Sequence, residues 1–228
     1  MKSEPAAAKS LPRPHPELVS RLSPIATSTL ANALDRCGLH DNVVRHIKAV
    51  APGFRFCGPA VTVKERAGGY GSFPSEGFRV GAMIDAAASG DVIVVDAGGA
   101  EASTWGGMAS LAASLKGIAG LLVDGGVRDL EEMVAFDFPV FARHMLPTTG
   151  RTRLKVESIN TAVIIDGVAV TPGDIVVADG TGVVIIPRER AEEIATLAEG
   201  FAKDDAAAMA DLRAGMTFSA VMNRYKGI

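Results

Sequence analysis

The chain has 228 residues, of which 48% are hydrophobic and 21% charged, so it can bury one good hydrophobic core or two small ones. Its 23 basic and 26 acidic residues are mixed along the sequence and give a formal net charge of −3. That distribution lacks the basic stripe of nucleic-acid-binding proteins, and no apolar run reaches the roughly 18 residues that a membrane helix needs. We therefore expect a soluble, cytoplasmic protein with no nucleic-acid and no membrane partner.

Prolines are concentrated at the start of the chain, where residues 1–16 contain four of them. This predicts a flexible N-terminal arm, followed by a single domain over residues 17–228. Ser23-Pro24 is typical of a helix start and Gly38 of a helix end, so a helix is predicted between them.

Strands and helices are predicted to alternate through the middle of the chain. The predicted strands cover residues 60–64, 91–96, 120–124 and 139–142, and the predicted helices cover residues 82–88, 108–115 and 129–136. Continuous apolar runs such as those of the later strands are typical of parallel strands covered on both faces. A glycine-rich loop is expected over residues 68–74.

After residue 147 the pattern changes to short strands. Asp166-Gly167 lies between two apolar runs within residues 162–170, which predicts a β-hairpin with a type I′ turn. The remaining predicted elements are strands over residues 174–178 and 182–186 and helices over residues 188–212 and 217–225. Together these elements predict one domain in which β-hairpins pack against an α/β layer.

Residues 120–132 carry the clearest chemical signal. A buried strand ends at Asp124, two glycines follow, and a helix is predicted to begin near Asp129. In α/β sheets, ligands bind at the carboxyl ends of strands, where helix N-termini favour anions. The guanidinium of Arg128 can bind a carboxylate in bidentate fashion, and Asp129 offers hard oxygen ligands to Mg²⁺ or Mn²⁺. The pattern suits a small 2-oxo acid held beside a divalent metal.

The same residues also allow a purely structural interpretation. Asp129 and Glu132 have the spacing of a capping box, in which both side chains bind backbone N–H groups at a helix start. Arg128 would then be an ordinary surface cation. Asp124 could either contact waters of the site or fix the turn that follows it. Spacing alone favours the capping box.

Several separated motifs resemble the class II 4-hydroxy-4-methyl-2-oxoglutarate aldolase family, which also includes the regulator of ribonuclease activity A. Gly107, then twenty residues, then Arg128-Asp129 and Glu132 is similar to the signature of that family. Further likeness over most of the chain is carried by Gly58-Pro59-Ala60-Val61-Thr62-Val63, Gly90-Asp91-Val92 with Asp96, Trp105-Gly106, Pro172-Gly173-Asp174, and Asp179 with Gly182-Val183-Val184 and Pro187.

The resemblance implies an α/β fold with three layers, β/β/α, of the swivelling, phosphohistidine-like kind. It implies that Arg128 binds the pyruvate portion of the substrate, that Asp129 ligates the metal, and that Glu132 marks the catalytic branch. The backbone after Gly107, at Met108 and Ala109, would hold the substrate carboxylate. The resemblance also implies a homotrimer or a hexamer made of two trimers, with active sites between subunits.

The resemblance implies two further acids near the site, one of which is missing in this chain. Many aldolases of the family carry an acid where this chain has Gly107, and that acid holds a metal-bound water. The family also uses an acid from the C-terminal helix of a neighbouring subunit, for which Asp204 or Asp205 is the nearest candidate. Asp124 is a further candidate for an outer contact.

The implied reaction is cleavage of a 4-hydroxy-2-oxo acid, such as 4-hydroxy-4-methyl-2-oxoglutarate, to pyruvate. Decarboxylation of oxaloacetate leaves the same enolate, and a divalent cation stabilises its charge as a Lewis acid, so one site can serve both reactions. The alternative function is a non-enzymatic regulator that binds a ribonuclease or a helicase. A methyltransferase is a third possibility, but the sequence has no glycine-rich nucleotide loop to support it.

Two other side chains, those of Lys64 and His144, are possible catalytic groups. Lys64 lies on a predicted strand, where a class I aldolase would carry a Schiff-base lysine, but strand lysines are more often surface residues. His144 follows a predicted strand and is more simply a loop histidine. The four histidines lack the spacing of a zinc site.

Overall fold

The structure is a computed structural model that describes residues 11–225. Its helices are α1 (Pro16–Leu22), α2 (Thr27–Arg36), α3 (Val80–Ala86), α4 (Gly107–Lys116), α5 (Leu130–Ala135), α6 (Ala191–Arg213) and α7 (Phe218–Arg224), with short 3₁₀ turns at Ser75–Gly77 and Arg188–Arg190. Its strands are β1 (Val43–Val44), β2 (Lys48–Ala49), β3 (Phe56–Ala67), β4 (Val92–Trp105), β5 (Gly120–Val127), β6 (Val140–Met145), β7 (Leu154–Ile159), β8 (Val163–Ile165), β9 (Val168–Val170), β10 (Ile175–Ala178) and β11 (Val183–Ile186).

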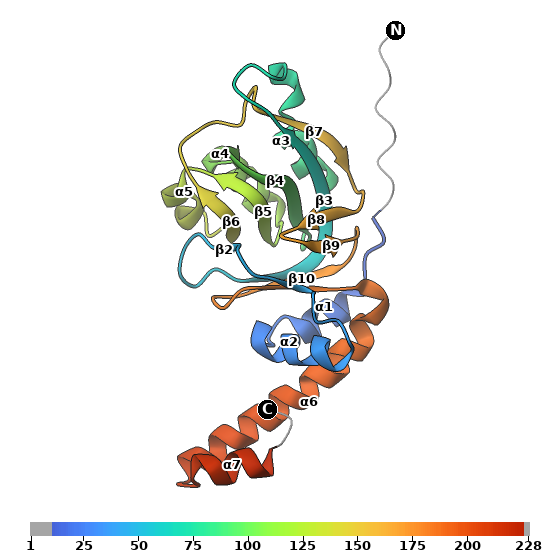
Figure 1. Cartoon of the computed structure of the whole chain (residues 1–228), viewed down its shortest axis with the longest axis vertical. Coiled ribbons are helices and arrows are strands. Elements are labelled where there is room, and N and C mark those ends of the chain that lie inside the picture. Colours follow the sequence, from blue (N-terminus) through green and yellow to red (C-terminus); the bar gives the residue numbers. More distant parts are fainter. Residues whose placement is uncertain (1–10, 226–228) are drawn as a thin grey trace.

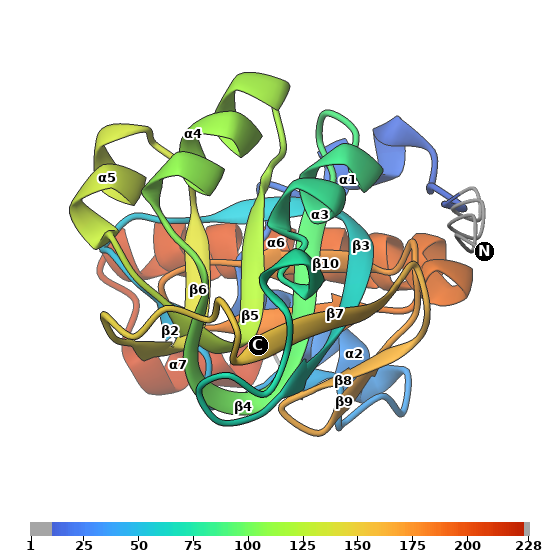
Figure 2. The same ribbon diagram turned by 90° about the horizontal axis from the view of Figure 1, so that it is seen from above.

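One large mixed sheet organises the chain. Its strand order is β1-β11-β10-β3-β4-β5-β6-β2, with β7 paired to β3, and β8-β9 form a separate hairpin. The consecutive strands β3, β4, β5 and β6 are parallel, which brings their carboxyl ends to one edge. Helices α3, α4 and α5 cover one side of these parallel strands (Figures 1 and 2). The predicted α/β fold is confirmed.

Strands β10 and β11 separate two hydrophobic cores because their side chains alternate between two faces. Val176 and Ile185 point into the main core with the parallel strands, whereas Ile175 and Ile186 pack in a second core with α1, α2 and α6. These three helices therefore form a layer beneath the strands that the β/β/α expectation did not include (Figure 1).

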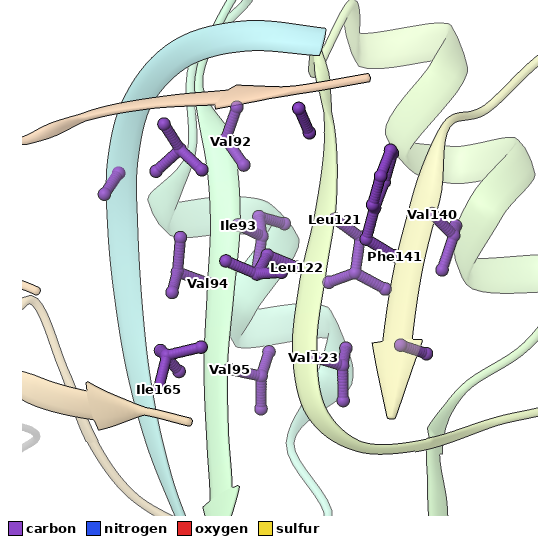
Figure 3. Packing of buried hydrophobic residues seen from close by; sticks show 14 of the residues in the cluster. Val92, Ile93, Val94, Val95, Leu121, Leu122, Val123, Val140, Phe141 and Ile165 are labelled. Carbon is purple, nitrogen blue, oxygen red and sulfur yellow. The ribbon is translucent and has the colours of Figure 1, made fainter. Parts of the chain in front are cut away.

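The main core is built on the parallel strands, whose residues are buried on both faces. Val94 on β4 and Leu122 on β5 are fully buried, and Phe141 on β6 packs edge-on against Phe56. Figure 3 shows these aliphatic side chains filling the space beside the strands. Such a scaffold holds the carboxyl ends of β4 and β5 rigidly.

Several predicted boundaries were wrong. The predicted helix from Ser23 is two helices: Ser23 ends α1 by donating its N–H to Val19, and α2 begins only at Thr27. Strand β4 runs to Trp105 rather than ending at residue 96, because Gly98 and Gly99, both with positive φ, let the strand bulge and continue. Strand β7 was not predicted, although its buried and exposed side chains alternate. The predicted hairpin at Asp166-Gly167 is confirmed.

Residues 1–10 of the predicted arm lie outside the described part of the chain. The arm's Arg13 donates two hydrogen bonds to the carboxylate of Asp91, at 2.9 and 2.7 Å, and the Asp91 side chain is only 1% exposed. Pro12 lies so close to Gly173 that a Cβ there would meet the Pro12 carbonyl oxygen at 2.1 Å. Residues 12–13 therefore pack on the body of their own chain. The single domain over residues 17–228 stays a prediction.

No helix among residues 11–225 has both the length and the apolar character needed to cross a membrane.

Candidate functional site

The candidate site lies where two neighbouring parallel strands end. The last residue of β4, Trp105, pairs with the last residue of β5, Val127, and the Arg128 amide donates to the Trp105 carbonyl at 3.1 Å. Helix α4 starts directly after β4, and Arg128 and Asp129 follow β5. Because the strands are parallel neighbours, these residues meet although twenty residues separate Gly107 from Arg128.

Asp129 has a backbone conformation that sends its side chain away from its own helix. Its φ of 61° lies in the left-handed region, which aspartate tolerates better than most residues. Its carboxylate caps no N–H of α5, and Oδ2 instead accepts a hydrogen bond from the Gly107 amide at 3.2 Å. The capping-box interpretation of Asp129 is therefore wrong. Asp129 joins the end of β5 to the start of α4.

Gly106 and Gly107 are the surface against which the charged side chains pack. A Cβ on Gly106 would lie 2.5 Å from Oδ2 of Asp129 and 3.3 Å from Nε of Arg128. A Cβ on Gly107 would lie 1.4 Å from Oε2 of Glu132, so any larger residue would displace that side chain. The Glu132 carboxylate thus occupies the space that an acid at position 107 would fill. Only glycine permits this arrangement.

The first turn of α4 has two backbone N–H groups that find no hydrogen-bond acceptor among the described residues. The Gly107 amide is bound by Asp129 and the Ser110 amide by Gly106, whereas Met108 and Ala109 come before the first intrahelical bond. Met108 as a residue is 87% exposed, and both Met108 and Ala109 line the cavity described below. Such a pair of amides favours an anionic oxygen.

One cavity of about 170 Å³ unites these groups. It is lined by Phe78, Val80, Ser103, Thr104, Trp105, Gly106, Gly107, Met108, Ala109, Arg128, Asp129 and Thr149. Of the predicted site residues, Gly107, Met108, Ala109, Arg128 and Asp129 share this wall. Glu132 is not part of the wall and stands next to it, against Gly107.

Buried hydrogen bonds hold the wall in shape. The indole N–H of Trp105 donates to Oγ of Ser110 at 3.0 Å, and that hydroxyl donates to the Gly106 carbonyl at 3.1 Å. Ser103 donates to the Trp105 carbonyl at 2.7 Å. By contrast, Nε of Arg128 and Oδ2 of Asp129 are 3.5 Å apart, and the two side chains are 45% and 41% exposed. An exposed pair of this kind contributes little to stability, so both side chains are available to a ligand.

Other predicted residues lie outside the cavity wall. Asp124 accepts a hydrogen bond from Arg143 at 2.5 Å and another from the Asp166 amide at 2.9 Å, so it holds the β8-β9 hairpin. Asp204 and Asp205 lie on α6, in the layer on the opposite side of the strands from α4 (Figure 1). Asp205 accepts from the Thr29 hydroxyl at 3.1 Å.

Lys64 and His144, the two alternative catalytic candidates, form contacts outside the cavity. Nζ of Lys64 donates to Asp96 at 2.8 Å, and Nε2 of His144 lies 3.1 Å from the Gly99 carbonyl oxygen. Neither residue lines the cavity.

Asp129 and Glu132 supply carboxylates that could hold a magnesium-type ion. Among residues 11–225, no three His, Cys, Asp or Glu side chains form a metal cluster. Asp129 is the one carboxylate in the cavity wall, and Glu132 stands beside it. Mg²⁺ is commonly bound through one or two carboxylates together with substrate oxygens, which this pair can provide.

Part of the cavity wall comes from residues that no sequence motif indicated. Phe78 and Val80 come from the segment that leads into α3, and Thr149 comes from the loop after β6. Ser103 and Thr104 belong to the unpredicted second half of β4. The one available signal was their position immediately before Trp105-Gly106.

Comparison with known proteins shows which sequences and folds this chain resembles. A family model described as "RraA-like: Aldolase/RraA" matches residues 27–185. A protein of Halalkalibacterium halodurans, provisionally named 4-hydroxy-4-methyl-2-oxoglutarate aldolase, is 31% identical over 192 residues, which cover 84% of this chain and 86% of that protein. An uncharacterised protein of Methanocaldococcus jannaschii is 48% identical over 101 residues. The chain spans only 48% of that protein, and only 29% of the protein DlpA of Legionella pneumophila, to which it is 30% identical.

Solved structures share the fold. An uncharacterised protein from Pseudomonas syringae has a TM-score of 0.82 at 26% identity, covering 92% of this chain and 98% of that one. Streptomyces coelicolor RraAS2, described as an unusual member of the RNase ES inhibitor RraA family, has a TM-score of 0.77 at 27% identity, covering 89% and 99%.

Proposed function

This chain belongs to the RraA-like (Aldolase/RraA) family, and from its cavity we propose that it is a divalent-metal-dependent lyase that releases pyruvate. The substrate is a 4-hydroxy-2-oxo acid such as 4-hydroxy-4-methyl-2-oxoglutarate, and oxaloacetate is decarboxylated at the same site. One observation carries the proposal. A guanidinium, a carboxylate and two unbonded helix amides share one small cavity, where a 2-oxo acid needs them.

Each group has a role that follows from its charge. The amides of Met108 and Ala109 hold the substrate carboxylate at the positive end of α4. Arg128 lies next to the 2-oxo group and stabilises the negative charge that develops there when the C3–C4 bond breaks. Because Arg128 is already positioned against Gly106, little reorganisation is needed during the reaction.

Asp129 and Glu132 would hold the divalent ion, Mg²⁺ or Mn²⁺. When bound, the ion supplies Lewis-acid stabilisation of the same developing charge. Asp129 is oriented for this role by its left-handed backbone and by the Gly107 amide. Glu132 lies where a side chain at position 107 would begin, and it would take the place of the acid that the family's aldolases often carry there.

We further propose that the protein works as a homotrimer or hexamer. Leu115 on α4 and Val134 on α5 are 80% and 52% exposed on the two helices that begin at the site, an arrangement that suits burial by a neighbouring subunit. Asp204 or Asp205 from that neighbour is the candidate for the additional acid. The cytoplasmic location stays a prediction.

The activity is tested by measuring pyruvate release from 4-hydroxy-4-methyl-2-oxoglutarate and from oxaloacetate. We expect turnover with Mg²⁺ or Mn²⁺, loss of turnover with a chelator, and recovery when metal is returned. Arg128→Ala should lower kcat/KM by about 100-fold or more while the fold is kept. Arg66→Ala is the matched control, because Arg66 forms an exposed ion pair with Glu157 away from the cavity.

The alternative proposal is a regulator that binds a ribonuclease or helicase. It draws support from the description of RraAS2 as a member of an RNase inhibitor family. Folded wild-type protein that turns over neither substrate with any divalent metal would favour this alternative.

A further inference from the structure

A carboxyl group lies buried behind the cavity wall. Glu65, on β3, is 2% exposed, and its Oε1 accepts a hydrogen bond from the Thr104 hydroxyl at 2.8 Å. Thr104, on β4, is itself part of the cavity wall. The carboxyl group of Glu65 is therefore hydrogen-bonded to a buried residue of the cavity wall.

Within residues 11–225, no cation forms an ion pair with Glu65. Its Oε2 is buried and has no hydrogen-bond partner among the described residues. The other charged side chains of β3 and of the elements packed on it either form ion pairs with one another or are exposed. The ion pairs are Lys64 with Asp96, Arg66 with Glu157, and Arg21 with Glu192 and Glu199. The exposed residues are Glu17, Asp85, Glu101 and Lys155. Burial, only partly offset by the Thr104 hydrogen bond, raises the pKa of Glu65 to about 7.

The protonation state of Glu65 decides what Thr104 offers to the cavity. When Glu65 is ionised it has no proton, so the Thr104 hydroxyl must donate to it and presents only lone pairs elsewhere. When Glu65 is protonated it can donate to Thr104, and the Thr104 proton is released for a ligand in the cavity. The ionised form also places a negative charge behind a pocket built for anions.

We propose that Glu65 is a positioning residue that acts through Thr104, so that its protonated form strengthens the hold of the cavity on a 2-oxo acid and its ionised form weakens it. This inference rests on the proposed function for the identity of the ligand. Ionisation of Glu65 removes the Thr104 hydrogen-bond donor and adds a negative charge, and both effects weaken the binding of an anion. Affinity and kcat/KM should therefore fall as the pH rises through neutrality.

The test compares wild type with Glu65→Gln, which has nearly the same shape and stays neutral. We expect kcat/KM of the wild type for oxaloacetate with Mg²⁺ to fall by about tenfold between about pH 6 and pH 8, and that of Glu65→Gln by less than about twofold. At high pH the variant should exceed the wild type, which a merely structural defect would not produce. Glu101→Gln, an exposed glutamate on the strand of Thr104, should keep the wild-type profile.

Two variants of Thr104 test the connection. Thr104→Ser keeps the hydroxyl and should keep the pH-dependent fall, whereas Thr104→Val removes it and should reduce the fall. A Glu65→Gln profile that superimposes on the wild-type profile would overturn the inference, even if the enzyme is active.

Oxalate, a stable analogue of the pyruvate enolate, gives a readout without turnover. Calorimetric titration over the same pH range with Mg²⁺ present should show oxalate affinity falling in wild type and staying level in Glu65→Gln. A wild type that turns over no substrate would refute the proposed function, and this titration would still decide the role of Glu65. Oxalate affinity independent of pH, or no oxalate binding at all, would refute the inference.

Discussion

Gly107 illustrates how the absence of a side chain builds the site. The Glu132 carboxylate fills the volume that a Cβ would need, and the Gly107 amide holds Asp129. A residue without a side chain thus determines, through its small size and its backbone N–H, where two carboxylates lie.

Gly107→Ala should therefore remove activity while the fold is kept. The new methyl group forces Glu132 away, and a misplacement of about 1 Å costs on the order of 100-fold in rate. The free energy of unfolding should fall by about 1–3 kcal/mol, because the new methyl group would also lie 2.8 Å from the Glu132 Cβ and must be accommodated by a shift. Gly81→Ala, in a first helical turn with open space around the Cβ, is the control that should leave kcat/KM unchanged. Full activity of Gly107→Ala would contradict the placement of Glu132.

Glu65 should also affect stability. Its pKa is raised in the folded protein from an ordinary 4.5 to about 7, so the folded state binds the proton more tightly than the unfolded state. Protonation of Glu65 therefore contributes to the free energy of unfolding at low pH. This contribution is lost as the pH rises from about 4.5 to about 7, and the free energy of unfolding falls by roughly 3 kcal/mol.

Thermal unfolding of wild type and Glu65→Gln checks this linkage. The variant does not ionise, so its Tm relative to wild type should rise as the pH increases from about 5 to about 8. A difference in Tm that is the same at all pH values would show that Glu65 stays in one protonation state.

At the scale of elements, the β8-β9 hairpin is tied to the parallel sheet through charged groups. Arg143 on β6 donates to Asp124 at 2.5 Å and to Asp166 in the hairpin turn at 2.6 Å. Burial opposes ionisation of Asp166, but hydrogen bonds from His46, Arg143 and the Arg45 amide lower its pKa well below the usual range. The turn itself requires positive φ at Asp166 and Gly167, 51° and 86°.

Gly167→Ala should destabilise the protein by about 1 kcal/mol, since alanine pays a steric cost in this conformation. Urea unfolding measures the change. Gly180→Ala, where the Cβ meets nothing and φ is not positive, should cost less. Equal effects of the two substitutions would argue against a strained turn at Gly167.

At the scale of the whole molecule, the cavity and the candidate acids of α6 lie on opposite sides of the strands. The cavity lies by α4 and α5, whereas the candidate acids Asp204 and Asp205 lie on α6 in the opposite layer (Figure 1). A single chain cannot bring them together without changing its fold, so any contribution from them must come from another subunit.

If the proposed homotrimer or hexamer forms, light scattering should give three or six times the mass of the chain. If the sites are shared, mixing Arg128→Ala subunits with subunits that carry both Asp204→Asn and Asp205→Asn should restore part of the activity lost in each. An active monomer would exclude the shared site.

The sequence by itself was sufficient for the elements whose signal is local. The apolar runs at residues 120–124 and 139–142 and the Asp166-Gly167 turn follow from periodicity and turn chemistry, which depend on near neighbours. The position of Arg128-Asp129 after a buried strand also follows from local order, so a ligand at that strand end could be predicted.

The tertiary structure alone decided what those residues contact. Spacing favoured a helix cap for Asp129, and only the parallel pairing of β4 with β5 directs it to the Gly107 amide. Glu65 carries no sequence signal either, because its burial and its bond to Thr104 arise from strands 39 residues apart in the chain. Contacts between distant segments are fixed by how strands pair and pack, and local patterns do not contain that information.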